Sequence, residues 1–274
     1  MSLHRFLFVA MLLLLSPVAI VSAAENVASL LPRAHAHNDY LHPRPLLDAL
    51  SHGFNSVEAD IYLVDDQLLV AHWYHEISPY RTLEKLYLDP LKERVEAGDG
   101  HVYPNAPPLR LLIDLKSDGE KTYAALDKVL AKYADMLCRV EDGKYYPGAV
   151  EVVISGNRPK QMLAEQKLRY AGLDGRLGDL GGKTPKHLMP LVSDNWKSHF
   201  KWKGAGEIPA AEKEKLQRLV DQTHAEGREI RFWGSPDTPA MWRVLDECGV
   251  DAINTDKLSG LAEYLNDEQK SQQN

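Results

Sequence analysis

Hydrophobic and polar positions follow one repeating order along most of the chain. Short extended runs, with period-two alternation or continuous apolar residues, are each followed by a loop or by a stretch with helical spacing. Eight such runs predict strands, the second of which returns through a turn: 33–37, 56–64 with 68–72, 109–116, 150–155, 176–180, 188–193, 229–233 and 251–255. Helices are expected at 45–52, 83–95, 123–137, 159–170 and 210–225, from about 242 to 248, and at the end of the chain to about 265.

This order predicts an α/β fold, and two architectures are compatible with it. One is a single TIM-type (β/α)8 barrel, and the other is a doubly wound open sheet. The polar residues favour the barrel, because many of them lie at or just past the carboxyl ends of the predicted strands, where barrel enzymes collect their active sites. These residues are His37, Asp60, His72, Asp114, Lys116, Ser155, Asn157, Asp194, Trp233 and Asn254.

The first residues have the pattern of a secretory signal. Arg5 precedes the apolar run 6–15, and small residues ending at Ala23 resemble a cleavage site. The apolar run is shorter than the roughly 20 residues that span a bilayer, so an uncleaved anchor is the weaker alternative. We therefore expect a signal peptide over 1–23 and one exported domain over 24–274, periplasmic or extracellular, with no stable membrane anchor after cleavage.

The composition excludes some classes of function but does not indicate an activity. The chain has 274 residues, of which 44% are hydrophobic and 26% charged, and its net charge is -7. Lys and Arg are scattered among the acids, so no nucleic-acid partner is expected. The only cysteines, Cys138 and Cys248, could form one disulfide or remain two buried thiols.

The strand at 56–64 carries an unusual pair of acids. Strand alternation places Glu58 and Asp60 on one face, opposite the apolar positions. Like charges held this close require a cation or a shared proton between them. Asp114 on the next strand offers a third carboxylate, and Asn38 could add an amide oxygen. This oxygen-rich set predicts one divalent cation, Mg²⁺ or Ca²⁺, rather than zinc.

Two histidines end strands beside these acids. His37 and His72 could act as an acid and a base for cleaving a P–O bond, because neutral imidazole carries protons near pH 7. His35 lies two residues earlier on the same face and is a further candidate for contact with a substrate. Trp233, at a strand end, could stack on a substrate group, and Asn254 lies at the same edge.

The residues 37–40, His-Asn-Asp-Tyr, resemble the His-Asn-Ser/Thr-Tyr string of eukaryotic phospholipases C. Glu58-x-Asp60, the later His72, the segment 113–116 and the last strand 249–256 are similar, in the same order, to glycerophosphodiester phosphodiesterases. The resemblance is to the phospholipase C-like phosphodiesterase superfamily, and within it to the His-x-His-Asn-Asp-Tyr subgroup that includes fungal altered-inheritance-of-mitochondria proteins.

The resemblance implies a barrel fold, a divalent metal, and cleavage of a small-molecule or lipid phosphodiester. It implies catalytic roles for His37 and His72 and a phosphate contact for Lys116. The His-Arg-Gly string of glycerophosphodiesterases and their insertion between the second and third strands are absent, so the head group stays open. Whether His35 or His37 is the first catalytic histidine also stays open.

Two other functions are compatible with the residues. His35-Ala36-His37 is also how amidohydrolase-type barrels begin a two-zinc site, although the further histidines that such a site needs at the fifth and sixth strands are absent here. The chain could also be a secreted binding module that kept the barrel without turnover.

Overall fold

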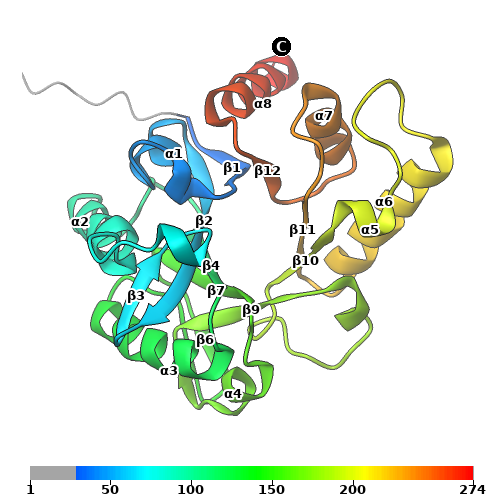
Figure 1. Cartoon of the computed structure of the whole chain (residues 1–274). Helices are drawn as coiled ribbons and strands as arrows, with labels where there is room; N and C mark the ends of the chain where they lie inside the picture. The colour runs from blue at the N-terminus through cyan, green and yellow to red at the C-terminus, as the bar shows by residue number, and fades with distance from the viewer. Residues whose placement is uncertain (1–28, 274) are drawn as a thin grey trace, which may run out of the picture.

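The chain forms a parallel eight-stranded barrel surrounded by helices, as the computed structural model of residues 29–273 shows (Figure 1). Going round the barrel, seven neighbouring pairs of strands are joined by parallel ladders, and the barrel is closed between the last two strands by a single bridge, Arg231 to Ala252. The TIM-type barrel predicted from the sequence is therefore confirmed. Its strands are β1 (Leu31–Ala36), β2 (Phe54–Val64), β4 (Leu109–Leu115), β7 (Val150–Gly156), β9 (Ala171–Gly175), β10 (Leu191–Asn195), β11 (Glu229–Trp233) and β12 (Ile253–Thr255).

Helices cover the outer face of the barrel, and the main hydrophobic core lies between the two layers. Side chains cap several of them: Thr238 accepts a hydrogen bond from the backbone of Met241 at the start of α7 (Pro239–Glu247), and Asp118 accepts one from the backbone of Lys121 at the start of α3 (Gly119–Leu130). The α-helices are α1 (Leu47–Ser51), α2 (Asp89–Ala97), α3 (Gly119–Leu130), α4 (Lys160–Glu165), α5 (Trp196–His199), α6 (Ala210–Ala225), α7 (Pro239–Glu247) and α8 (Leu258–Gln273). A π-helical turn, η3 (Glu84–Leu88), precedes α2, and 3-10 turns lie at η1 (Asp39–Leu41), η2 (Tyr74–Glu76), η4 (Ala131–Tyr133) and η5 (Leu177–Asp179).

The inside of the barrel is largely polar. Leu112, Val153 and Leu191 form a small apolar cluster of their own, separate from the outer core. They alternate along their strands with residues that pack against the helices, as the period of a strand requires. Along β4 and β7, Arg110 and Glu151 lie on the amino-end side of this cluster, and Asp114 and Ser155 lie on its carboxyl-end side.

The fifth barrel strand is where the sequence-based prediction was wrong. A strand was expected at 176–180, but β9 ends at Gly175 and η5 follows it; the preceding helix ends at Glu165 rather than at 170. The strand contains two glycines, which made it resemble a loop. Both lie in close packing, because a Cβ would lie 2.7 Å from Pro190 at position 172 and 2.4 Å from the Met189 side chain at position 175.

A small antiparallel sheet beside the barrel was not predicted. It consists of β5 (Arg139–Glu141), β6 (Lys144–Tyr146) and β8 (Leu168–Arg169). Asp142 and Gly143 form the turn between β5 and β6 with positive φ angles of 47° and 79°. An Asp-Gly pair between short extended runs is a typical hairpin signal, so the sequence did contain this information.

A second hairpin extends beyond the barrel and returns the chain to the site. The long strand β2 pairs with β3 (Gln67–Val70) through a turn at Asp65 and Asp66, whose φ angles are 47° and 61°. The amide of Ala71 then donates to the carbonyl of Asp60 at 3.2 Å. His72, although distant in sequence, is thereby placed next to Asp60.

Cys138 and Cys248 are both buried free thiols, so no disulfide joins them. The predicted signal peptide at 1–23 lies outside the described residues. Within residues 29–273, none of the helices has the length and apolar character needed to cross a bilayer.

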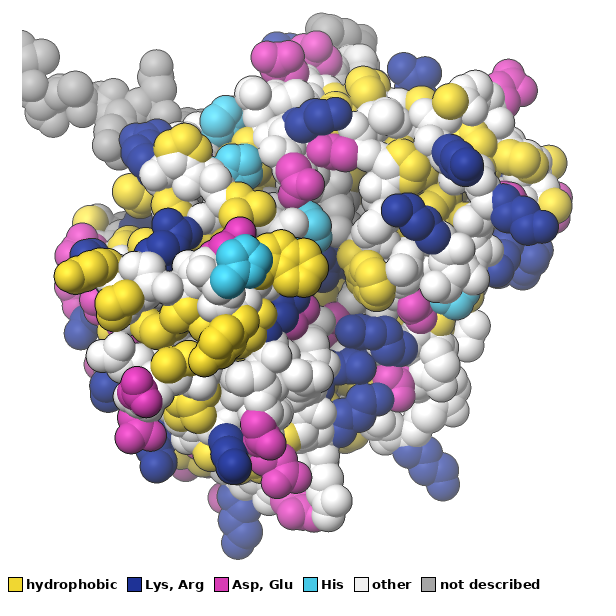
Figure 2. Space-filling view, viewed as in Figure 1, with side chains coloured by type: hydrophobic (Ala, Val, Ile, Leu, Met, Phe, Trp, Pro, Cys, Tyr) yellow, Lys and Arg dark blue, Asp and Glu magenta, His cyan; other side chains and the backbone are white. Residues whose placement is uncertain are grey.

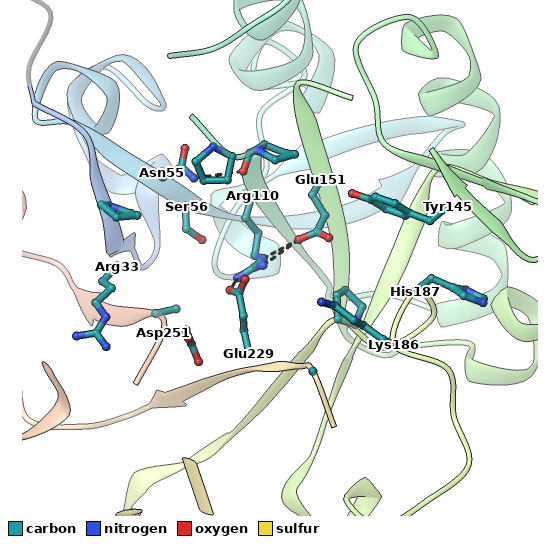
Figure 3. Close-up of a pocket in the computed structure, with 16 residues that line it drawn as sticks. Arg33, Asn55, Ser56, Arg110, Tyr145, Glu151, Lys186, His187, Glu229 and Asp251 are labelled. Carbon is teal, nitrogen blue, oxygen red and sulfur yellow. Dashed lines mark hydrogen bonds and ion pairs between the residues drawn. The ribbon is translucent and has the colours of Figure 1, made fainter. Parts of the chain in front are cut away.

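A cavity of about 820 Å³ lies at the amino ends of the strands, opposite the edge that carries His37 and His72 (Figure 3). Arg110 is buried at this end of the barrel, which we call the floor. Its guanidinium group links β4 to β7 and β11. It contacts Glu151 at 2.9 Å and Glu229 at 2.7 Å. Burial opposes the charged form of Glu229, but the charge of Arg110 outweighs it and lowers the pKa of that carboxyl.

Arg110→Met should destabilise the barrel by about 2 kcal/mol at pH 7, because it leaves two carboxylates without their partner while Glu229 is still partly hydrated. A carboxyl whose pKa is lowered on folding stabilises the protein above its unfolded pKa and loses this contribution as the pH falls through the folded value. The difference in free energy of unfolding between wild type and variant should therefore become smaller below about pH 4. Urea unfolding at pH 7 and below about pH 4 measures the free energies of unfolding, and the exposed Lys92→Met is the control. An equal difference between wild type and variant at the two pH values would contradict the ion pairing.

Candidate active site

Three carboxylates converge at the carboxyl edge of the barrel. Glu58 and Asp60 point inward from β2, and Asp114 is the register partner of Asp60 on β4. One oxygen from each lies within 4.8 Å of the others. Figure 2 shows histidine and acidic side chains around the hollow at the centre of this face. The structure thus brings together the three acids that the sequence proposed as metal ligands.

The charges in this cluster are only partly balanced. Burial opposes the charged form of Glu58, but Arg231 at 2.5 Å and a hydrogen bond from His35 hold the pKa of Glu58 well below its usual range. Burial and the charge of Glu58 raise the pKa of Asp60, and burial raises the pKa of Asp114 to about 6. Two of the three acids are therefore destabilised as anions in the absence of a further positive charge.

The donor set fits a hard divalent cation. Lys116 contacts Asp60 at 3.0 Å and Asp114 at 3.4 Å, yet Asp60 Oδ1 is buried with no hydrogen-bond partner among the described residues. A buried carboxylate oxygen without a partner is costly unless something else binds it. Three carboxylates converging with such an unused oxygen are the ligands that Mg²⁺ and Ca²⁺ prefer.

Tyr40 and His72 form the next contacts around Asp60. The Tyr40 hydroxyl lies 2.6 Å from Asp60 Oδ2 and 2.8 Å from Asn38 Oδ1. His72 Nδ1 lies 3.1 Å from the same Asp60 oxygen and 3.0 Å from the Tyr40 hydroxyl. With Nδ1 engaged by the carboxylate, Nε2 is the ring nitrogen of His72 that is left for proton transfer.

His37 lies on the other side of the carboxylates, just after β1. Its Nδ1 is 2.8 Å from Asp256 Oδ1 and 3.0 Å from the amide nitrogen of Asn38. Burial opposes the charged ring, but the hydrogen bond to Asp256 and the charge of Glu58 outweigh it and raise the pKa of His37. Asn38 has φ 48°, a left-handed conformation that Asn tolerates well, and this turn directs its side chain toward Tyr40.

His35 is buried beneath the cluster and does not line the opening. Its ring nitrogens contact Ser56 Oγ at 2.7 Å and Glu58 Oε2 at 3.2 Å. Burial and the charge of Arg231 lower the pKa of His35 to about 3. A neutral, inaccessible ring with both nitrogens engaged can orient Glu58 but cannot reach a substrate. Of the two histidines in His35-Ala36-His37, only His37 is available for chemistry.

Arg231 is the site residue that sequence reasoning missed. It lies buried on β11, where it pairs with Glu58 and donates from Nε to Asn254 Oδ1 at 2.7 Å. Asn254 therefore orients Arg231. Trp233 lies two residues further along β11 and is half-buried. The signal was present, because Arg231 is a charged residue between two apolar residues of β11, as Glu58 is on β2.

Gly156 makes room for Asp114. It is the last residue of β7 and has a positive φ of 67°, and a Cβ at this position would lie 2.0 Å from Asp114 Oδ1 and 2.6 Å from the carbonyl of Leu115. No other residue fits this place without displacing the carboxylate or the backbone of β4.

The amino-terminal part of the chain, residues 24–174, matches the model of the AIM6-like phosphodiesterase domain. The altered inheritance of mitochondria protein 6 of Eremothecium gossypii is 30% identical, over 85% of this chain and 69% of that protein. The chain belongs to the AIM6-like phosphodiesterase family.

Two further relatives match over a similar share of this chain. The family homologue of Arthroderma benhamiae is 27% identical over 84% of this chain and 83% of its own length, and that of Saccharomyces cerevisiae is 29% identical over 82% and 68%. Among solved structures, a putative glycerophosphoryl diester phosphodiesterase from Agrobacterium tumefaciens superposes with a TM-score of 0.49 and 13% identity, covering 88% of this chain and 99% of that one.

In this AIM6-like domain, Gly156→Ala should displace Asp114 and weaken Mg²⁺ or Ca²⁺ binding by at least about tenfold, measured by titration calorimetry. Gly143→Ala is the matched control, since Gly143 also has a positive φ but nothing lies within 4 Å of the added Cβ. Both variants carry similar backbone strain. Equal cation affinity in the two variants would contradict the role given to Gly156.

Proposed function

We propose that the chain is a divalent-cation-dependent phosphoric diester hydrolase that acts on a glycerophosphodiester or a phospholipid-type head group. The observation that carries this proposal is the convergence of Glu58, Asp60 and Asp114 within 4.8 Å of one another. Lys116 and two accessible histidines lie around this cluster, and membership of a phosphodiesterase-domain family supports the same reaction class.

Glu58, Asp60 and Asp114 would hold the cation, with Asn38 as a further oxygen ligand. When bound there, a divalent cation neutralises a non-bridging phosphate oxygen and lowers the pKa of the attacking hydroxyl. Lys116 contributes a second positive contact to the phosphate, because its ammonium group already lies beside two of the carboxylates at the opening. Arg231 and His35 fix Glu58 from below.

His37 and His72 exchange protons with the two reacting oxygens. Their side chains, 30% and 33% exposed, can be reached by a substrate from the opening. One ring accepts the proton of the attacking hydroxyl while the other gives a proton to the leaving oxygen. Asp60 and Tyr40 orient the ring of His72, and Asp256 orients the ring of His37.

The two-zinc hydrolase alternative has no structural support within residues 29–273. The metal-type cluster found there consists of carboxylates alone, and His35, which would begin a zinc site, is occupied by Ser56 and Glu58. Oxygen-only ligands favour Mg²⁺ or Ca²⁺ over zinc.

His72→Asn should lower kcat on bis(p-nitrophenyl) phosphate by roughly 10²- to 10⁴-fold and leave cation affinity unchanged. The amide can keep the hydrogen bond to Asp60 but cannot accept a proton. Asp60→Asn should instead weaken both activity and cation binding. The exposed neighbour His75→Asn is the control and should remain active.

Activity is assayed with EDTA and after adding back Mg²⁺ or Ca²⁺, and cation affinity by calorimetry. Full activity of His72→Asn would rule out its role. Wild type that cleaves none of a panel of phosphodiesters with either cation, or that binds two zinc ions, would overturn the proposed function.

A further inference from the structure

The chain between β1 and α1 contains a strained turn close to the proposed active site. Leu46 has φ 64° and ψ -53°, and the amide of Leu47 donates to the carbonyl of Pro45 at 2.7 Å. Leu46 is therefore the central residue of a γ-turn with positive φ, a conformation that is rare and strained for a residue with a Cβ. Such a conformation persists only where surrounding contacts hold it, and it is most frequent at functional sites.

Asp39 holds this turn from within the core. Its side chain is inaccessible, and its Oδ2 accepts hydrogen bonds from the amide of Leu46 and from the hydroxyl of Tyr87 at 2.9 Å. Asp39 Oδ1 is buried and has no hydrogen-bond partner in residues 29–273. Tyr87 is fully buried and lies in η3, and π-helical turns of this kind are also frequent at functional sites. Two donors thus stabilise a buried carboxylate, and Tyr87 is the one that a single atom deletion can remove.

The segment that contains Tyr87 supports both sides of the proposed active site. Arg81 donates from Nη2 to the carbonyl of Tyr40 at 2.5 Å. The carbonyl of Arg81 accepts a hydrogen bond at 2.7 Å from the amide of Val70, the last residue of β3, which lies two residues before His72. Residues 81–87 therefore fix the position of Tyr40 and of the hairpin end that carries His72.

The Tyr40 hydroxyl is where this support reaches the reacting groups. It lies 2.6 Å from Asp60 Oδ2 and 3.0 Å from His72 Nδ1. Hydrogen bonds weaken steeply as distance and angle depart from the preferred values, so a small displacement of Tyr40 changes the orientation of the His72 ring. Asp39 is the residue directly before Tyr40 and is itself too deeply buried to contact a substrate.

We propose that Asp39 and Tyr87 are positioning residues of the active site: their hydrogen bond holds residues 38–46 in the conformation that places the Tyr40 hydroxyl between Asp60 and His72. This inference rests on the proposed phosphodiesterase function. Without the Tyr87 hydroxyl, the buried carboxylate keeps one donor, the γ-turn loses part of its support, and Tyr40 moves away from its two partners. The effect of Tyr87 on the reaction then passes entirely through Tyr40.

Tyr87→Phe removes one hydroxyl and keeps the ring in the core. We expect kcat on bis(p-nitrophenyl) phosphate to fall on the order of tenfold and KM to change by less than about twofold, because proton transfer is misaligned while substrate binding is kept. Tyr103→Phe is the matched control. Tyr103 is also buried, but its hydroxyl donates to the carbonyls of Leu50 and Phe54 outside the cluster, so kcat should be unchanged. Thermal unfolding confirms that both variants are folded.

A double-mutant cycle tests the route through Tyr40. In a Tyr40→Phe protein, the further change Tyr87→Phe should lower kcat by less than about twofold, because the hydroxyl that it positions is already absent. A full loss on the order of tenfold in that background would overturn the inference. Equal losses of kcat in Tyr87→Phe and Tyr103→Phe would overturn it as well, since the effect would then be general to the core.

Nitrogen NMR of the imidazole rings tests the positioning without turnover. At about pH 8, where imidazole is ordinarily neutral, the two ring nitrogens report which of them carries the proton, and the signal of His72 is the one missing from His72→Asn. His72 should carry its proton on Nδ1, beside Asp60, in wild type and in Tyr103→Phe, and should be a mixture of both tautomers in Tyr87→Phe. Identical His72 signals in Tyr87→Phe and wild type would overturn the inference. If wild type cleaved no diester, the NMR comparison would still decide it, and the proposed function alone would fail.

Discussion

The repulsion among three carboxylates inside the barrel is the constraint on which the site depends. Two paired strands fix the backbone positions of Glu58, Asp60 and Asp114, and one carboxylate oxygen of each lies within 4.8 Å of the others. Arg231 and Lys116 compensate part of this charge. The remainder, with the unused oxygen of Asp60, is the charge that a cation would neutralise in the proposed site.

The surrounding residues form layers that follow from strand register. Directly below the acids, His35 and Ser56 orient Glu58. At the opposite end of the barrel, Arg110 joins two glutamates across the floor, so buried charge is paired at both ends while the small cluster containing Leu112 separates them. A barrel filled in this way relies on the outer helices for its apolar stabilisation and uses its interior to fix charged groups.

The rim of the barrel carries two pairs of an acid and a cation in similar positions. Asp174 and Arg176 reproduce on β9 the spatial relation of Asp114 and Lys116 on β4, with one difference. Asp174 is fully hydrogen-bonded, whereas Asp114 is available to a cation. Only the arrangement on β4 therefore leaves its carboxylate free for a cation.

The sequence alone determined the alternation of strands and helices, the barrel, and the inward face of β2, since all of these follow from the period of hydrophobic positions. It also indicated Glu58, Asp60 and Asp114 as one group, because acids at the ends of adjacent parallel strands must lie close together. Where the local signal was weak, the sequence-based prediction failed. The glycines of β9 resembled a loop, and only their contact with the segment before β10 shows why these positions have no side chain.

Only the tertiary structure decided which polar residues do what. Alternation put His35 and His37 on the same face, but the depth at which each lies in the barrel makes the first a buried support and leaves the second accessible. The pairing of Arg231 with Glu58 joins residues 173 positions apart, and no local pattern encodes such a contact. Periodicity fixes the face on which a side chain lies, whereas burial, charge partners and access depend on strands that meet only in the closed barrel.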